Sequence, residues 1–252
     1  MLKEKNIPLI DQLNQYIEPV DPEWSERIKP ANRELLLELR KYLGMQEAGL
    51  SLPVSLIEFA YNAGENDGGI ISTTLKGTFS ITELVKNNEE IYNFEKENIN
   101  PYYFEFLTDE MGLSYGVKYD DKIEKGIYYE DTCFVSSSFK NLLFQSAVRL
   151  YEEKYYANTV AFGASINSLK EASYERKGLE PFVLADDMCT LYGLKKAWFN
   201  DNNFFFAYSD NVSIYLLNQV SISGKISGNH SELIKKMIEY LLPKIGAKIQ
   251  DF

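Results

Sequence analysis

The sequence predicts an α+β fold in which helices pack on an antiparallel sheet meander, followed by a C-terminal α+β extension with a second meander and a closing helix. Apolar residues recur at helical spacing near the amino terminus, and aromatic and polar residues alternate in segments around residues 101–130. A second set of alternating segments precedes an amphipathic stretch at residues 230–244. With 252 residues, 45% of them hydrophobic, the chain buries enough core for one large or two smaller domains.

Two short helices are expected before residue 64. In "ANRELLLELRKYLG", leucines recur one turn apart and Gly44 stands where a helix would end. In "LSLPVSLIEFAYN", Pro53 suits the first turn of a new helix. The apolar faces of these helices are formed by Leu35, Leu36, Leu39 and Leu43, and by Leu52, Leu56, Phe59 and Ala60.

The glycine-rich stretch "AYNAGENDGGI" at residues 60–70 is interpreted as a turn. A phosphate loop needs a lysine or hydroxyl residue and a helix after its glycines, and the next residues, 70–74, are predicted to form a strand. A calcium loop needs alternating oxygen ligands closed by a distal glutamate, and Glu65 and Asp67 supply only a fragment of that pattern. The stretch is therefore expected to be scaffold that turns a helix into a strand.

The middle of the chain predicts a helix, a meander and a second helix. Ser80 and Glu83 have the spacing of a capping box, so "SITELVKNNEEIYNF" is expected to be helical. "PYYFEFL", "LSYGVKY" and "KGIYYE" alternate like strands, with Tyr115, Val117 and Tyr119 on one face. "CFVSSSFKNLLFQSAVRLYEE" passes from a strand through a serine cap into a helix. The apolar stripe of that helix is Phe139, Leu142, Leu143, Ala147 and Leu150.

A second cycle of strands and helix follows residue 157. "KKAWF", "NFFFAYS", "VSIYLL" and "VSISGKI" read as short strands, and "HSELIKKMIEYLLPK" as an amphipathic helix. The two cycles share an order of elements that an old duplication or a generic α+β arrangement would both explain. The aromatic run at residues 204–206 implies that both faces of its strand are covered, or that one face meets a partner. The apolar residues of the closing helix are Leu233, Ile234, Met237, Ile238, Leu241 and Leu242.

Charge and cysteine content narrow the class of protein. The formal net charge of −11 disfavours binding to nucleic acid and to anionic membranes, and it favours basic protein partners. Cys133 and Cys189 lie far apart without the spacing of metal ligands, which fits a reducing cytoplasm. The amino-terminal apolar cluster is too short for a signal or membrane segment. A cytoplasmic protein without cofactor or metal is expected.

The sequence offers little catalytic chemistry. His230, the only histidine, stands at the expected start of the last helix, and no serine lies in a G-x-S-x-G elbow. Paired carboxylates of the kind that hydrolyse glycosides occur at 109–110, 120–121 and 186–187. Adjacent acids in a strand point to opposite faces, so these pairs are interpreted as solvated turn residues. No catalytic residue is predicted.

The segment "RKYLGMQEAGLSLPVSLIEFAYNAGENDGG" resembles the N-terminal motif of the SUKH superfamily, the Smi/Knr-like proteins. That motif is a helix ending in Leu-Gly, then Leu-Pro, then a helix ending in Asn-Gly-Gly, which is stretched here to "NAGENDGG". A strand followed by a Ser-Phe helix start is matched by "CFVSSSFKNLLF". The resemblance covers residues 30–152. The positions carried over as structural are Leu43, Gly44, Leu52, Pro53, Gly68, Gly69, Ser138 and Phe139.

With this resemblance, the chain is expected to comprise a helical lead-in at 1–29, a SUKH-like domain at 30–157, and, outside the resemblance, a C-terminal α+β extension or second domain at 158–252. The resemblance also implies a binding protein, since many bacterial members look like immunity proteins that neutralise a toxin, often a nuclease. The alternatives are a regulatory scaffold for a non-toxin partner and a carboxylate-dependent hydrolase. The partner, expected to be a basic toxin domain, would meet acidic turns at Glu65, Asp67, Asp109, Glu110, Asp120, Asp121 and Glu124.

Overall fold

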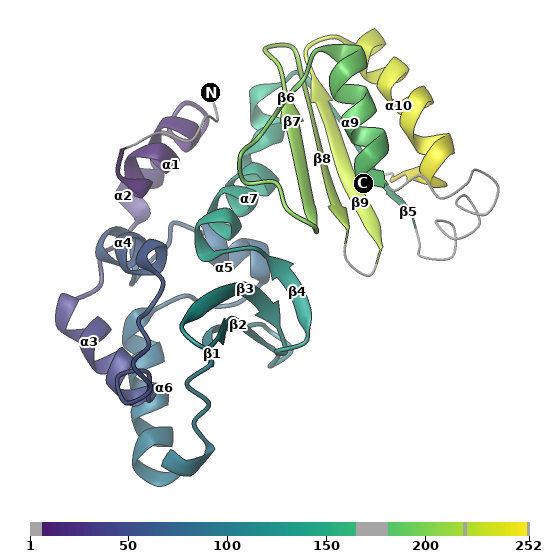
Figure 1. The fold of residues 1–252 in the computed structure, drawn as a ribbon. Helices are drawn as coiled ribbons and strands as arrows, with labels where there is room; N and C mark the ends of the chain where they lie inside the picture. Colours follow the sequence, from purple (N-terminus) through teal and green to yellow (C-terminus); the bar gives the residue numbers. More distant parts are fainter. Residues whose placement is uncertain (1–6, 165–180, 219–220, 251–252) are drawn as a thin grey trace. The chain divides into compact units, whose positions relative to one another are not determined.

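The computed structural model describes residues 7–164, 181–218 and 221–250 (Figure 1). The chain divides into two compact units, an N-terminal unit that ends at Leu150 and a C-terminal unit that begins at Tyr151. Helices and two antiparallel sheets build these units, so the predicted α+β class is confirmed. Each unit has a sheet and helices of its own.

Helices make up the first part of the N-terminal unit. The side chain of Asn32 accepts a hydrogen bond from Glu34 N–H at the start of the first predicted helix, and Gly44, with φ +65°, follows its end. Ser80 Oγ accepts a hydrogen bond from Glu83 N–H at 3.3 Å, so the serine cap predicted from the sequence is present. The helices are α1 (Leu9–Ile17), α2 (Trp24–Arg27), α3 (Arg33–Tyr42), α4 (Val54–Ala63), α5 (Ile70–Leu75) and α6 (Ile81–Phe94), with a 3-10 turn η1 (Lys96–Asn98).

The strand predicted at residues 70–74 is wrong, because this segment forms helix α5. Its β-branched residues favour a strand, but the Asp67 carboxylate accepts the backbone N–H groups of Ile71 and Ser72 and so stabilises a first helical turn. Gly69 precedes the helix with φ +89°, and Lys76 ends it with φ +56°. Local capping outweighs strand propensity here.

A four-stranded antiparallel sheet in the order β1-β2-β3-β4 follows, as the sequence predicted. Within β2, Val117 and Tyr119 are buried and Tyr115 is partly buried. Tyr115 pairs with Tyr129 of the next strand, their ring centroids 4.8 Å apart. The strands are β1 (Tyr103–Thr108), β2 (Ser114–Asp120), β3 (Ile123–Tyr129) and β4 (Cys133–Ser136), and helix α7 (Phe139–Tyr151) comes next.

Four phenylalanines from separate segments form the centre of the N-terminal unit. Phe139 at the start of α7 lies 6.1 Å from Phe59 of α4, 6.2 Å from Phe79 and 5.4 Å from Phe106 of β1, measured between ring centroids. Each of these rings is almost fully buried. The predicted apolar faces of α4 and α7 therefore meet, and the buried set includes Leu52, Leu56, Phe59, Phe139, Leu142 and Leu143.

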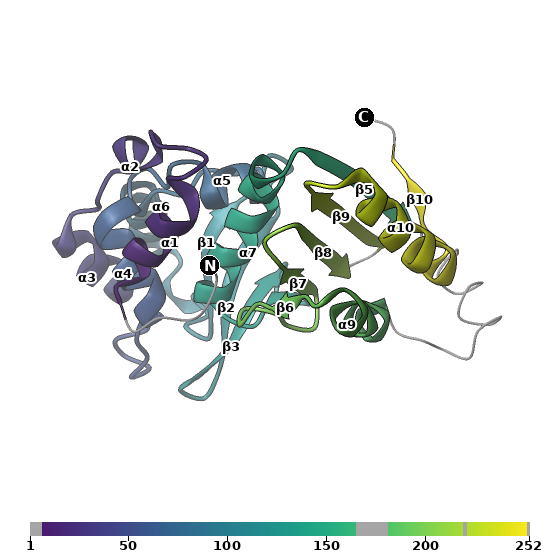
Figure 2. The ribbon, with the colours of Figure 1, turned by 90° about the horizontal axis from the view of Figure 1, so that it is seen from above.

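The C-terminal unit is a six-stranded antiparallel sheet in the order β10-β5-β9-β8-β7-β6. Helices α9 and α10 lie on one face of this sheet (Figure 2). Its elements are η2 (Glu152–Tyr155), β5 (Asn158–Ala164), α9 (Pro181–Tyr192), β6 (Lys195–Lys196), β7 (Phe204–Tyr208), β8 (Val212–Asn218), β9 (Ile222–Gly228), α10 (Ser231–Ile245) and β10 (Lys248–Ile249).

The second meander and the closing helix were predicted, whereas β5, β10 and α9 were not. Strand β5 pairs with β9 along its whole length, from Asn158 opposite Gly228 to Ala164 opposite Ile222. Helix α9 contains Asp186 and Asp187, so the prediction that these acids form a turn is wrong. They lie on the exposed side of the helix, opposite its buried residues, which is why they resemble solvated turn acids in sequence.

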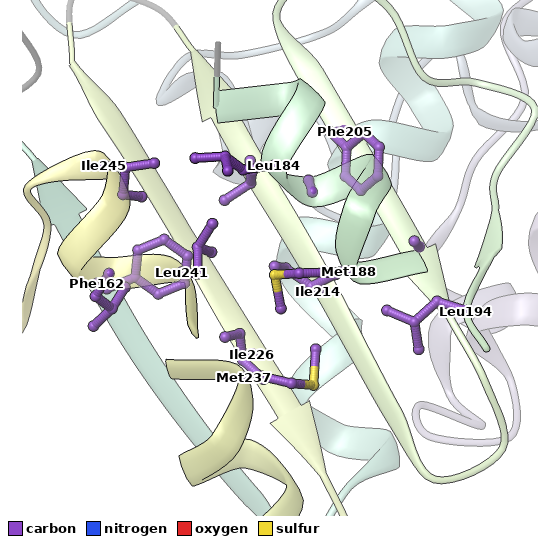
Figure 3. Packing of buried hydrophobic residues seen from close by; sticks show 14 of the residues in the cluster. Phe162, Leu184, Met188, Leu194, Phe205, Ile214, Ile226, Met237, Leu241 and Ile245 are labelled. Carbon is purple, nitrogen blue, oxygen red and sulfur yellow. The ribbon is translucent and has the colours of Figure 1, made fainter. Parts of the chain in front are cut away.

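Figure 3 shows how the two helices bury their apolar sides on the sheet of the C-terminal unit. Leu184 and Met188 of α9 and Met237 of α10 belong to this core cluster, together with Ile214 and Ile226 from the central strands. On β7, the residues of the aromatic run are all buried, so both faces of this strand are covered, as the sequence implied. That run is Phe204, Phe205 and Phe206.

The side chain of Asn200 makes hydrogen bonds with the backbone of β7 at the edge where only the short strand β6 pairs with it. The Asn200 amide donates to Phe206 C=O at 3.0 Å and accepts from Phe206 N–H at 2.8 Å. Phe206 C=O also accepts from Ala197 N–H at 3.0 Å, so the Asn200 amide adds to the backbone pairing of this edge and supplies the acceptor for Phe206 N–H. Beyond it, β6 contributes only Lys195–Lys196, and such short, charged edges resist pairing with another chain.

Candidate protein-binding surface

The residues that carry the family resemblance occupy helix ends and turns. Pro53 directly precedes α4, and Ser138 Oγ accepts a hydrogen bond from Asn141 N–H at 3.1 Å at the start of α7. Gly68 has φ +63°, and a Cβ at this position would lie 2.3 Å from Nε1 of the buried Trp24. Only glycine fits there. Of the remaining positions, Leu43, Leu52 and Phe139 are buried, while Gly44 and Gly69 have positive φ.

Asp67, predicted to lie on the partner surface, is buried with 2% of its surface exposed. One carboxylate oxygen accepts from Ile71 N–H and Ser72 N–H, each at 2.7 Å. The other accepts from Gly69 N–H at 2.9 Å and from the Ser72 hydroxyl at 3.0 Å. The expectation that this turn acid is solvated is wrong, because its carboxylate stabilises the first turn of α5.

Glu65 performs a similar task at the next helix. Its carboxylate accepts hydrogen bonds from the Ser80 hydroxyl at 3.0 Å and from Thr82 N–H at 3.1 Å, at the start of α6. The backbone of the loop is tied down as well, since Lys29 N–H donates to Asn66 C=O at 2.9 Å. The glycine loop is therefore a junction that caps two helices, in agreement with its interpretation as scaffold.

Two further predicted acids are engaged inside the sheet region. Asp109 accepts hydrogen bonds from Met111 N–H at 2.9 Å and Leu113 N–H at 3.0 Å, and so closes the β1–β2 turn. Glu124 accepts from Phe139 N–H at 3.2 Å at the start of α7. Burial raises the pKa of Glu124 above its usual value, and the hydrogen bond from Phe139 opposes this effect.

The remaining predicted acids, Glu110, Asp120 and Asp121, are exposed. Asp120 and Asp121 form the tip of the β2–β3 hairpin, where Asp121 adopts φ +54°. The side chain of Asp120 is 76% exposed and lies 3.3 Å from Lys125 Nζ. Because Lys122 also belongs to this turn, positive charge accompanies the acids at the tip.

A second exposed surface, which the sequence analysis did not single out, lies on α6. Phe94 and Ile91 project from this helix with 81% and 44% of their surface exposed. By helical spacing, both lie away from the side of the helix that buries Ile81 and Val85. An apolar residue on the side of a helix opposite its buried stripe is the sequence signal that would have identified this surface.

Helix α6 is held to α3 on its other side (Figure 1). The rings of Tyr42 and Tyr92 meet edge to face with centroids 5.6 Å apart, and the Tyr42 hydroxyl donates to Glu89 at 3.1 Å. Lys96 Nζ donates to the Tyr92 hydroxyl at 3.0 Å and to Glu47 at 2.9 Å. The Tyr42 contacts join the C-terminal turns of α6 to the end of α3, and Lys96 of η1 joins the segment after α6 to Glu47 in the segment after α3.

Other site chemistry is limited in the part of the chain that the structure describes. His230 precedes α10, as expected, and its side chain makes no capping hydrogen bond. Within residues 7–164, 181–218 and 221–250, no cluster of three or more His, Cys, Asp or Glu residues has an arrangement that would hold a metal ion. No helix among these described residues has both the length and the apolar character needed to cross a membrane.

Comparison of the chain with protein-family models, curated proteins and solved structures found no match.

Proposed function

We propose that this chain is a non-catalytic, cytoplasmic immunity protein of the SUKH type that neutralises a basic toxin by direct binding. What supports the proposal most is the arrangement of the motif residues in the N-terminal unit. The Leu-Gly, Leu-Pro and Ser-Phe positions stand at helix ends or starts beside the four-stranded sheet, while the Gly-Gly pair leads into helix α5 and not directly into the sheet. These residues are structural, and they leave the outer surface free to vary with the partner.

The net negative charge of the chain supports the inference that its protein partner is basic. A formal net charge of −11 attracts cationic proteins over distances comparable to the Debye length and raises the rate of encounter. Glu110, Asp120 and Asp121 remain exposed and are available for such steering. The partner is therefore expected to present lysine and arginine at its contact surface.

The internal use of several acids argues against the hydrolase alternative. Asp67 and Asp109 accept hydrogen bonds from backbone N–H groups of their own turns, which gives each a structural task. A carboxylate that acts as acid, base or nucleophile must instead face the substrate. The Asp120–Asp121 pair lies at a hairpin tip.

Co-expression tests the proposal. The polypeptide encoded by the gene adjacent to this chain's gene, which the proposal expects to be a toxin, is produced in bacteria with this chain, with the Phe139→Ala variant, or with an unrelated acidic protein. The proposal expects growth protection by the wild-type chain and a complex that copurifies with an inactivated toxin. A lack of protection at equal protein levels would contradict it.

Copurification and an activity assay on the purified chain separate this proposal from the scaffold and hydrolase alternatives. A stable complex with a neighbouring protein that is not toxic would favour a regulatory scaffold. Turnover of glycosides, nucleic acid or esters by the purified chain, lost on Asp120→Asn or Asp187→Asn, would favour a hydrolase.

A further inference from the structure

The outer face of α6 combines acidic and apolar side chains on one side of a fixed helix. Glu83, Asn87, Glu90 and Phe94 recur at spacings of four, three and four residues, which places them in one row, and Ile91 lies beside them. All of these residues are exposed. We call this set, Glu83, Asn87, Glu90, Ile91 and Phe94, the outer α6 face.

We propose that the outer α6 face is the surface that contacts the basic protein partner, with Phe94 inserted into an apolar pocket of that partner. Glu83 and Glu90 would meet lysine or arginine side chains around the pocket. This inference rests on the proposed function and names the surface through which it operates.

The geometry of α6 favours Phe94 as an anchor. The opposite side of the helix contacts α3 through Tyr92 and Tyr42, and Lys96, just after the helix, donates to Glu47, so contacts on both sides of Phe94 in the chain hold its backbone in place. Ordering before binding lowers the entropic cost of association. Aromatic side chains are enriched in the centres of protein interfaces and carry a large share of the binding energy.

Charge selects a basic protein as the occupant. Glu90 lies one turn before Phe94 in the same row and Glu83 lies further towards the start of the helix, and the chain as a whole carries a net charge of −11. A second copy of this chain would bring the same acids against them, and like charges across an interface are unfavourable. A basic partner gains both the apolar contact and the attraction.

The test uses as its probe the polypeptide encoded by the gene adjacent to this chain's gene, inactivated by mutation if it is toxic as the proposed function expects. Binding is measured with the full-length chain and with Phe94→Ala and Glu90→Lys. The controls are Glu239→Lys on α10, which repeats the charge reversal, and Leu191→Ala on α9, which truncates an exposed apolar side chain; both positions are exposed helical positions of the C-terminal unit. Thermal unfolding of every variant verifies that it is folded.

Phe94→Ala is expected to raise Kd about tenfold or more, as truncation of an interface anchor does. Glu90→Lys is expected to slow association at low salt, with a smaller difference at high salt. Both controls should bind like the wild type. If Phe94→Ala and Leu191→Ala bind with the same Kd as the wild type, the inference is overturned while the proposed function stands.

Two other outcomes would also contradict the inference that the outer α6 face contacts a basic partner. If the wild-type chain forms no complex with the probe, the proposed function and the inference both fail. If sedimentation shows a dimer of the wild-type chain that Phe94→Ala converts to monomer, the outer α6 face is a self-association surface and the basic partner is ruled out as its occupant.

Discussion

The carboxylate of Asp67 binds Ser72 twice, through the backbone N–H at 2.7 Å and through the hydroxyl at 3.0 Å. This pair joins the glycine loop to α5 and explains why a β-branched segment is helical. The hydroxyl of Ser72 in turn accepts a hydrogen bond from Phe79 N–H at 3.3 Å, next to α6. One buried acid therefore organises the loop and the segment that follows it.

Replacement of Asp67 by alanine is expected to lower the free energy of unfolding by roughly 1.5–3 kcal/mol, because charged hydrogen bonds to buried N–H groups are lost. Asp67→Asn keeps one acceptor oxygen and should lose less. Urea denaturation of both variants measures the effect. Asp120→Ala, at an exposed position, is the control and should stay within about 0.5 kcal/mol of the wild type. Equal midpoints for Asp67→Ala and Asp120→Ala would contradict the capping role.

The aromatic centre of the N-terminal unit predicts a large effect of Phe139→Ala. Loss of a fully buried ring in contact with Phe59, Phe79 and Phe106 should cost roughly 3–5 kcal/mol. Phe94→Ala removes the same side chain from an exposed position and should cost little. Thermal or chemical unfolding distinguishes the two, and an unchanged midpoint for Phe139→Ala would refute the packing described here.

Glu124 predicts a pH dependence of stability. Burial raises its pKa in the folded state, so folding favours the neutral carboxyl group. The stability that this preference contributes is present below the ordinary glutamate pKa of about 4.3, and is lost as pH rises through the higher folded-state pKa.

Glu124→Gln cannot ionise, and it should therefore become more stable relative to the wild type as the pH is raised from about 4 to about 7. Urea unfolding of both proteins across this range measures the difference. A difference that stays constant with pH would show that Glu124 does not titrate at a perturbed pKa.

The edge of the six-stranded sheet predicts a role for Asn200. Asn200→Ala removes the acceptor of Phe206 N–H and one of the two donors to Phe206 C=O, and should lower the free energy of unfolding by about 1–3 kcal/mol. Exposure of the β7 edge should also promote aggregation, which light scattering during heating would detect. Asn202→Ala, at an exposed position of the same turn, should behave like the wild type.

Charge reversal at the β2–β3 hairpin remains a prediction from the sequence. Changing both Asp120 and Asp121 to lysine should slow association with a basic toxin more than it changes stability, and the effect should fade as salt rises. Stopped-flow binding across a salt series measures it. Identical rates for wild type and variant at every salt concentration would remove these acids from the encounter surface.

The predictable parts of this fold are those in which local pattern and tertiary packing agree. The leucine spacing of α3, the serine cap of α6 and the alternation in β1 to β3 each predicted the correct element. At residues 70–74 the β-branched composition predicts a strand, but a local contact decides otherwise, because the Asp67 carboxylate caps the segment as a helix. Helix α9 was missed because two adjacent acids, Asp186 and Asp187, interrupt its apolar residues.

Burial was the main obstacle to predicting which acids are exposed on a candidate partner surface. Exposed and buried acids look alike in sequence, and only the structure separates Asp67 and Glu124 from Asp120. Phe94 was overlooked for the opposite reason, since an aromatic residue in a helix is ordinarily assigned to the core.

The pairing of β5 with β9 also has a consequence for the order in which the chain acquires its structure during synthesis. Strand β5 ends at Ala164, but its partner is complete only when the ribosome has passed Gly228. Neighbouring hairpins such as β1–β2 close as soon as they emerge, whereas this remote pairing must wait, and long-range contacts slow folding. The N-terminal unit is therefore expected to fold while translation continues, and the six-stranded sheet to close only as the last helix leaves the ribosome.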